Sequence, residues 1–132
     1  MFALPVFAAA SLWSAQSKDY GSGNADFTLR EIERRPNSSV LQLDIRTRGS
    51  SVGSSMITAC MLMRLAQERG GYRYLVKIDA LPSNPKQMLV GFSHVANVKP
   101  QTLDAELSDS AMEVDLELFG SDLNKKCRAN VN

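Results

Sequence analysis

Thiols and imidazoles are scarce in this chain of 132 residues, which contains two cysteines and one histidine. Cys60 and Cys127 lie too far apart in the sequence to form a CxxC redox or zinc motif. With His94 as the single imidazole, no local set of metal ligands can be assembled. The two thiols could pair in an oxidising compartment, or they could remain as two small buried hydrophobic residues. The sequence therefore predicts neither a metal nor another cofactor.

A strong net charge is also missing. The formal charge of +1 gives no electrostatic reason to expect nucleic acid or an anionic membrane as a partner. The charges are unevenly placed, because residues 1–99 hold twelve Lys and Arg against seven Asp and Glu, whereas residues 100–132 hold three against seven. Oppositely charged cross-strand pairs are common in sheets, so we expect late acidic strands beside early basic ones. A binding role for either patch is the alternative.

No apolar run is long enough to cross a membrane. Residues 2–13 are apolar and uncharged, but a transmembrane helix needs about 20 apolar residues. The segment is typical of the apolar part of a secretory signal, and Ala8–Ala10 offers a cleavage site. No Lys or Arg precedes Lys18, so the basic region of a signal is missing. We predict export, with a cytoplasmic protein that carries an apolar N-terminal arm as the alternative.

The composition predicts one folded domain. A chain of this length can bury a real core but is too short for a two-domain enzyme. The small and polar residues from Lys18 to Ala25 are typical of a flexible linker. We therefore divide the chain into a signal-like segment with its linker over residues 1–25 and a single α+β domain over residues 26–132.

Hydrophobic periodicity predicts one helix among the strands of this domain. Ile57, Met61 and Leu65 recur at helical spacing, and Gly70 with Gly71 can end the helix in a left-handed turn. The predicted helix covers residues 55–69. Alternation of apolar and polar residues indicates five strands. These are residues 26–33, 40–48, 72–79, 87–95 and 111–119, with a polar connection over residues 97–110.

The resulting order, β-β-α-β-β-β, favours a two-layer α+β fold. One main helix would pack on a mostly antiparallel or mixed sheet of about five strands. The opposite sheet face would be solvated, because charged residues alternate with the apolar ones on several strands. Its predicted members are Arg46, Arg48, Arg73, Lys77, Glu113, Asp115 and Glu117.

A turn between the second strand and the helix matches a catalytic motif. Residues 49–53, from Gly49 to Gly53, satisfy G-x-S-x-G, and Asp79 and His94 follow Ser51 in the chain order of an α/β-hydrolase triad. A single strong helix and a chain this short do not supply the crossover helices of that fold. We therefore interpret the serines as helix caps and His94 as a partly buried structural residue on a strand. A small serine hydrolase remains the alternative.

Three segments of the chain resemble a group of small bacterial envelope proteins. They are Ile45-Arg46-Thr47-Arg48-Gly49, Leu62-Met63-Arg64-Leu65-Ala66 and Gly71-Tyr72-Arg73-Tyr74-Leu75-Val76. In these proteins, many of which are described as lipoproteins, a strand ending in Gly leads to an L-x-R-x-A helix and a G-Y-x-Y-F-V strand. The match covers about a third of the chain and implies export and fold, with no active site. This chain departs from the group in lacking a lipidated cysteine.

Together these observations predict an exported protein of the bacterial periplasm or cell envelope that acts as a non-enzymatic binding or structural module. No catalytic or cofactor-binding residue is proposed. The expected partner is an envelope protein, a lipid or a cell-wall component and not nucleic acid; a homo-oligomer formed through a sheet edge is the other possibility. In the exported protein we predict that Cys60 and Cys127 can pair and tie the helix to the C-terminal tail.

Overall fold

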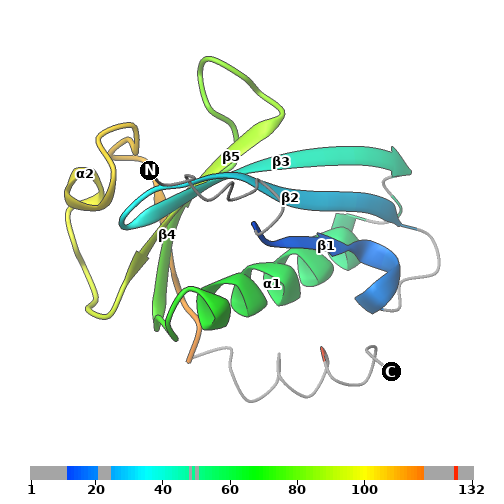
Figure 1. Ribbon diagram of the computed structural model, residues 1–132, viewed down its shortest axis with the longest axis horizontal. Coiled ribbons are helices and arrows are strands. Elements are labelled where there is room, and N and C mark those ends of the chain that lie inside the picture. The colour runs from blue at the N-terminus through cyan, green and yellow to red at the C-terminus, as the bar shows by residue number, and fades with distance from the viewer. Residues whose placement is uncertain (1–11, 21–24, 48, 50, 118–126, 128–132) are drawn as a thin grey trace, which may run out of the picture.

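The strand segments pair in one sheet in the computed structural model, which describes residues 12–20, 25–47, 49, 51–117 and 127, without the side chains of residues 51 and 52. All neighbouring strands are antiparallel. The α+β class is confirmed, with six strands instead of about five (Figure 1). Across the sheet these are β1 (Ser14–Gln16), β2 (Asp26–Arg34), β3 (Ser38–Thr47), β5 (Gln87–Ser93), β4 (Tyr74–Ile78) and β6 (Met112–Asp115).

The additional strand, β1, lies in the segment that was expected to be signal and linker. Ala15 pairs with Leu29 of β2, and the 3₁₀ helix η2 (Ser17–Tyr20) follows β1 directly. Trp13 and Tyr20 are both buried. The predicted flexible linker is therefore wrong over residues 18–20, because an aromatic side chain there reaches the core; residues 1–11 and 21–24 lie outside the described part.

Helix α1 (Ser51–Glu68) crosses one face of the sheet (Figure 1). It begins at Ser51 and not near residue 55, because Gly49 adopts a positive φ of 68° and turns the chain at once after β3. It ends as predicted. Gly70, at φ 135°, donates its N–H to Gln67 O, and Gly71 donates its N–H to Ala66 O, which together form a Schellman cap.

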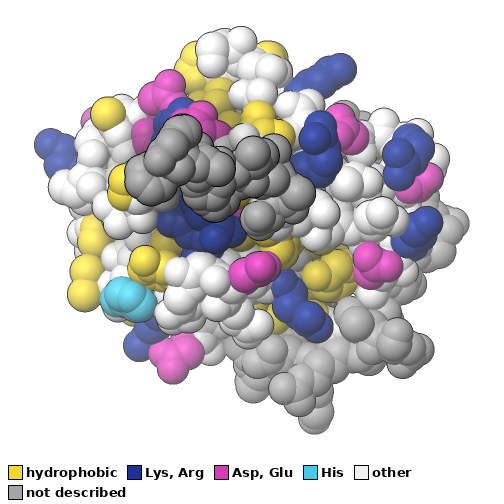
Figure 2. All heavy atoms as spheres, in the orientation of Figure 1, with side chains coloured by type: hydrophobic (Ala, Val, Ile, Leu, Met, Phe, Trp, Pro, Cys, Tyr) yellow, Lys and Arg dark blue, Asp and Glu magenta, His cyan; other side chains and the backbone are white. Residues whose placement is uncertain are grey.

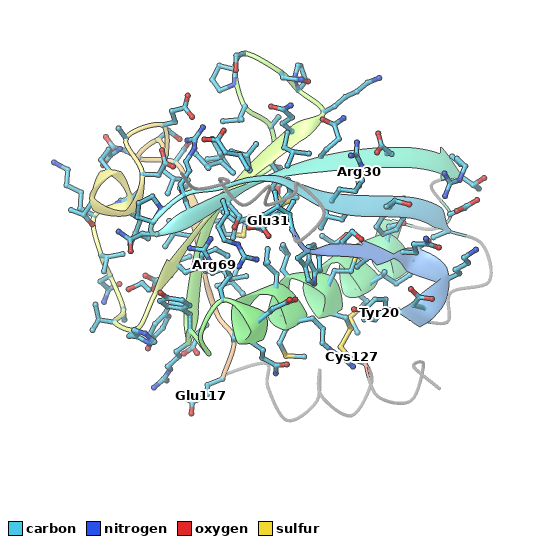
Figure 3. The ribbon with its side chains drawn as sticks, viewed as in Figure 1. Tyr20, Arg30, Glu31, Arg69, Glu117 and Cys127 are labelled. Atoms are coloured by element: carbon cyan, nitrogen blue, oxygen red, sulfur yellow. A yellow bond between two sulfur atoms is a disulfide. The ribbon has the colours of Figure 1, made fainter. Side chains whose placement is uncertain are left out.

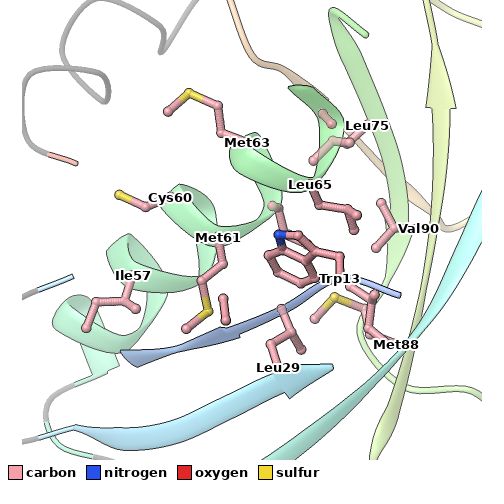
Figure 4. Packing of buried hydrophobic residues seen from close by; sticks show 14 of the residues in the cluster. Trp13, Leu29, Ile57, Cys60, Met61, Met63, Leu65, Leu75, Met88 and Val90 are labelled. Carbon is pink, nitrogen blue, oxygen red and sulfur yellow. The ribbon is translucent and has the colours of Figure 1, made fainter. Parts of the chain in front are cut away.

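The main core fills the space between α1 and the sheet. Figure 4 shows the Trp13 indole between the helix and the strands, beside Met61, Leu65 and Leu29. Met61, Leu65 and Leu29 are fully buried. The indole of the first described segment therefore packs at the centre of the helix–sheet layer, so β1 is part of the fold's core and not an appendage.

A second, smaller core lies on the opposite face of the sheet. The segment predicted as a polar connection contains the short helix α2 (Pro100–Leu103) and packs on β4 and β5. The predicted solvated face is therefore wrong at this end of the sheet. Lys77 was also misassigned, because it pairs with Val90 on the α1 side. The buried members of this second cluster are Val40, Val76, Leu81, Leu89 and Leu107.

Gly91 in β5 lets this second cluster form. A Cβ atom there would lie 3.0 Å from the Cδ1 atoms of Leu103 and Leu107 and 3.1 Å from Leu103 Cβ. We expect Gly91→Ala to lower the free energy of unfolding by about 1–2 kcal/mol, because the segment over β5 must move outward. Urea denaturation measures this. An unchanged or higher stability would show that Leu103 and Leu107 yield without loss.

The predicted pairing of early basic with late acidic residues is present in the structure. Arg73 forms ion pairs with Asp115 and Glu117 at 3.2 and 2.9 Å. Arg35 contacts Asp104 and Glu106 at 2.9 and 2.7 Å. Basic and acidic side chains lie beside each other at several places on the face shown in Figure 2. The uneven distribution of charge along the sequence is thus balanced in space at these two sites.

Candidate functional site

A small cavity opens between the end of the sheet and the first turns of α1. Its volume is about 270 Å³. The β2 and β3 side chains that face the helix form its apolar wall, and hydroxyl-bearing residues of α1 form the other side. The lining residues are Phe27, Leu43, Ile45, Gly49, Ser54, Ser55 and Thr58. None of them carries a charge, so the cavity suits an uncharged, largely apolar group.

The apolar wall follows from the alternation of β2 and β3. Phe27 pairs with Ile45 and Leu29 with Leu43, so these four side chains point to the same face. Phe27 is buried, whereas Ile45 retains 38% of its exposure. On the helix side, the Thr58 hydroxyl donates to Ser54 O at 2.8 Å, so this donor is already used within α1. The cavity therefore has an apolar floor at Phe27 and an accessible rim at Ile45.

The G-x-S-x-G turn borders this cavity, but the structure separates the acid and base of the hydrolase alternative. Asp79 and His94 follow opposite ends of the β4–β5 pair, in which Tyr74 pairs with Ser93 and Ile78 with Leu89. Six residue steps along the strands place them roughly 20 Å apart, far beyond hydrogen-bond reach. The side chain of Ser51 lies outside the described part, and Asp79 forms an ion pair with Lys77.

His94 is not the partly buried strand residue that was predicted. It lies just after β5 and is exposed, and Figure 2 shows its imidazole at the surface. The ring stacks on Tyr72, with centroids 4.3 Å apart, and Tyr72 in turn contacts Phe92 at 5.5 Å. The position after the end of β5 explains the exposure, because the chain leaves the sheet there.

A buried ionic cluster lies at the other end of α1. The Glu31 side chain is fully buried and accepts two hydrogen bonds from Arg34, at 2.7 and 2.9 Å, and one from Ser39. Burial alone would raise the pKa of Glu31, but these hydrogen bonds and one from the Trp13 N–H outweigh it and lower that pKa. Arg69, at the end of α1, lies 3.7 Å from the Glu31 carboxylate.

Arg69 also binds the backbone of the β2–β3 turn. It donates to Ser38 O, Arg35 O and Pro36 O at 3.2, 2.9 and 3.1 Å, and its guanidinium lies 5.1 Å from the Phe92 ring centroid. Figure 3 shows Glu31 and Arg69 facing each other between the sheet and α1. Every charged group in this cluster is engaged with the protein itself. We therefore assign the cluster to the fold.

The two cysteines meet on the side of α1 that faces away from the sheet (Figure 3). Cys60 and Cys127 form a disulfide with their Cα atoms 5.7 Å apart, within the range that this bond requires. Both are buried, and Cys127 belongs to the main core cluster together with Tyr20. The bond holds Cys127 against the middle of the helix.

Family models, curated proteins and solved structures give no match to this chain. The candidate site thus stands on its own geometry. Within the described residues, no three His, Cys, Asp or Glu side chains come together as metal ligands would. No helix there is both long and apolar enough to cross a membrane.

The alternation that predicts strands over residues 26–33 and 40–48 also puts Phe27, Leu43 and Ile45 on apolar faces, but it does not identify a cavity. Alternation shows which side a residue faces, but the cavity exists because β3 is longer than the β5 segment beside it. The buried cluster had a visible signal. Glu31 shares the face of Phe27 and Leu29, and a carboxylate on an apolar face requires a buried partner.

Proposed function

We propose that this protein is an exported bacterial envelope or periplasmic domain that acts by binding and not by catalysis. The observation that carries the proposal most directly is the disulfide between Cys60 and Cys127. Such bonds persist in oxidising compartments and are rare where thiols are kept reduced. The resemblance to small envelope proteins points to the same compartment. The hydrolase alternative loses support because Asp79 and His94 lie at opposite ends of two strands.

The position of Trp13 agrees with removal of an N-terminal signal. The backbone of Trp13 exchanges two hydrogen bonds with Glu31, accepting at 2.8 Å and donating to the carboxylate at 3.2 Å. Cleavage after Ala10 would leave Trp13 and all of β1 in the mature chain. Cleavage further along, within η2, would remove the indole from the core. The Ala8–Ala10 site is thus compatible with the fold.

The cavity between β3 and α1 supports a binding role. Binding sites are commonly apolar concavities with a few convergent polar groups, and this cavity combines Phe27, Leu43 and Ile45 with the hydroxyl-bearing rim of Ser54 and Ser55. Its neutral lining favours an apolar ligand group over nucleic acid or another polyanion. We therefore place the binding function at this end of the molecule.

Fractionation of a bacterial host that expresses the full chain tests the compartment. We expect the protein in the periplasm, with Ser11 as its first residue and with Cys60 and Cys127 resistant to alkylation. Intact-mass spectrometry measures both properties. A variant that lacks residues 2–10 is the matched control and should stay in the cytoplasm. Wild-type protein in the soluble cytoplasm, with Met1 retained and both thiols alkylated, would contradict the proposal.

A further inference from the structure

Strand β3 extends well beyond its neighbour β5. The register pairs Ser38–Gln42 of β3 with Gln87–Gly91 of β5, and the last contact is the Leu43 N–H donating to Lys86 O at 3.0 Å. From Asp44 to Thr47, β3 pairs with β2 alone among the described residues. Figure 1 shows β5 leaving the sheet while β3 continues beside β2. Among the described residues, this part of β3 therefore has no neighbour on the β5 side, and we call that side the free edge.

The hydrogen bonds of the turn before β5 determine where its pairing with β3 stops. Pro85 has no N–H to donate, the Lys86 N–H donates to Asn84 Oδ1 at 3.1 Å, and the Gln87 N–H donates to Asn84 O at 3.0 Å. The next donor on the β3 side before Lys86 is the Asn84 N–H, and it donates to Leu81 O at 3.0 Å inside the turn. The end of pairing after Leu43 is thus part of the construction of the fold and not fraying of a strand.

The backbone groups on the free edge can be assigned from the alternation of the strand. Successive residues direct their N–H and C=O groups to opposite sides, so Ile45 faces the same side as Leu43, toward the space that β5 has left. No described residue binds the N–H or C=O of Ile45 on that side. The register shift between the Phe27–Ile45 and Asp26–Thr47 pairs turns Thr47 back toward β2, so an extended segment placed there could exchange main-chain hydrogen bonds with Ile45.

The candidate cavity lies beside this edge. Ile45, on the free edge, and Leu43, the last residue of β3 that is bonded to the β5 side, both line the cavity together with Phe27 and Thr58. Its 270 Å³ falls below the roughly 300–1,000 Å³ of pockets that hold a drug-sized ligand. The volume suits a single apolar side chain better than a whole small molecule. Backbone donors and acceptors next to a pocket for one side chain are the two parts of strand-addition recognition.

We propose that an extended segment of a protein partner adds to β3 beside Ile45 and inserts one apolar side chain into the cavity. This inference deepens the proposed binding function by naming the class of ligand. A second copy of this chain is a poorer occupant, because its own Leu43 and Ile45 already line its own cavity and point toward its own α1. Main-chain bonds to Ile45 would supply affinity, and the apolar cavity would select the side chain.

Backbone-modified peptides test the inference on the full, oxidised chain. The probe is a pool of blocked hexapeptides in which threonine alternates with leucine, valine, isoleucine or phenylalanine, titrated to about 1 mM, the weak end of specific binding. In two-dimensional ¹H–¹⁵N spectra we expect the amide of Ile45 to shift and to exchange with solvent at least about tenfold more slowly. The same pool with alternate backbone nitrogens methylated should bind at least about tenfold more weakly.

A matched pair of variants locates the binding site. Thr58→Phe fills the cavity from α1 and should weaken binding by about tenfold or more, whereas Val95→Thr, at a highly exposed position outside the cavity, should leave it unchanged. Circular dichroism checks that each variant is folded, and the methylated pool tests the inference without any substitution.

Three results would overturn the inference. They are no shift at Ile45 with any pool, equal binding of the methylated pool, and the same shifts appearing on concentration of the protein without peptide, which would identify a second copy as the occupant. The test of this inference is independent of the test of export. If the chain binds the peptides but stays in the cytoplasm, the strand-addition inference holds and the export proposal fails. If the chain is exported but binds no peptide, export holds and the strand-addition inference fails.

Discussion

Replacing Arg69 with alanine is expected to lower the free energy of unfolding by about 3–5 kcal/mol, the range for breaking a buried charge pair. Only 6% of the Arg69 side chain and none of the Glu31 side chain is exposed. The substitution leaves Glu31 with one arginine and removes the donor of three turn carbonyls. Urea denaturation followed by circular dichroism measures the change.

The control for Arg69 is an arginine on the solvated face of the same sheet. Arg30 pairs with Asp44 at 3.2 Å, and both side chains are about half exposed. Exposed pairs of this kind contribute only about 0–1 kcal/mol, so Arg30→Ala should have a small effect. If the two variants lose the same stability, the cluster at the end of α1 does not hold the helix to the β2–β3 turn.

The same cluster predicts the direction of the pH dependence. Burial opposes ionisation of Glu31, but hydrogen bonds from Arg34, Ser39 and Trp13 prevail and keep its pKa below the ordinary 4.5. A carboxyl with a lower pKa in the folded chain stabilises the fold above its unfolded pKa, and this contribution is lost as pH falls through the folded value. Below pH 4.5 the stability of Glu31→Gln should therefore decline less steeply than that of wild type. Parallel curves would remove Glu31 from the acid response.

Loss of the disulfide is expected to lower the free energy of unfolding by about 4 kcal/mol, the chain-entropy estimate for a loop of this size. Cys60 and Cys127 are separated by 67 residues, so the bond removes much of the freedom of the unfolded chain. It also holds a C-terminal residue that is 2% exposed in the main core. Guanidinium denaturation of the oxidised protein, of the reduced protein and of the Cys60→Ala/Cys127→Ala variant measures the effect.

The double variant also provides the control for the reductant. Reduction should destabilise wild type but leave the variant unchanged, because the variant has no bond to break. The reduced wild type and the variant should unfold at similar denaturant concentrations. A wild type that unfolds at the same point with and without reductant would show that the bond contributes nothing in solution, and it would also weaken the argument for an oxidising compartment.

The proposed function and the stability of the fold rely on opposite ends of α1. The Glu31–Arg69 cluster joins the end of the helix to the sheet, whereas the cavity lies under its first turns, beside Ile45. Substitutions at Arg69 should therefore change the free energy of unfolding more than the peptide affinity. Thr58→Phe should change the peptide affinity more than the free energy of unfolding. The proposed binding site is thus separate from the contacts that hold the other end of α1 to the sheet.

The candidate site shows where sequence reasoning reached its limit. Alternation along residues 40–48 correctly puts Leu43 and Ile45 on one face of a strand. The G-x-S-x-G turn begins at Gly49, which lines the cavity. The cavity itself required a comparison of two strands that are far apart in the chain. The sequence pattern predicts the approximate length of β3. It does not predict the residue at which β5 stops pairing with β3.

Local patterns by themselves determined the five strand segments after residue 25, the amphipathic helix and its Gly70–Gly71 ending, because each depends on neighbours within a few residues. Tertiary structure alone decided that Trp13 enters the core, that residues 98–111 cover the outer face, and that Arg69 meets Glu31. It also decided that, in the described part of the chain, β3 is bonded to the β5 side only as far as Leu43. The physical reason is that these features are contacts between distant segments, and an apolar or charged side chain does not encode which distant partner will bury it.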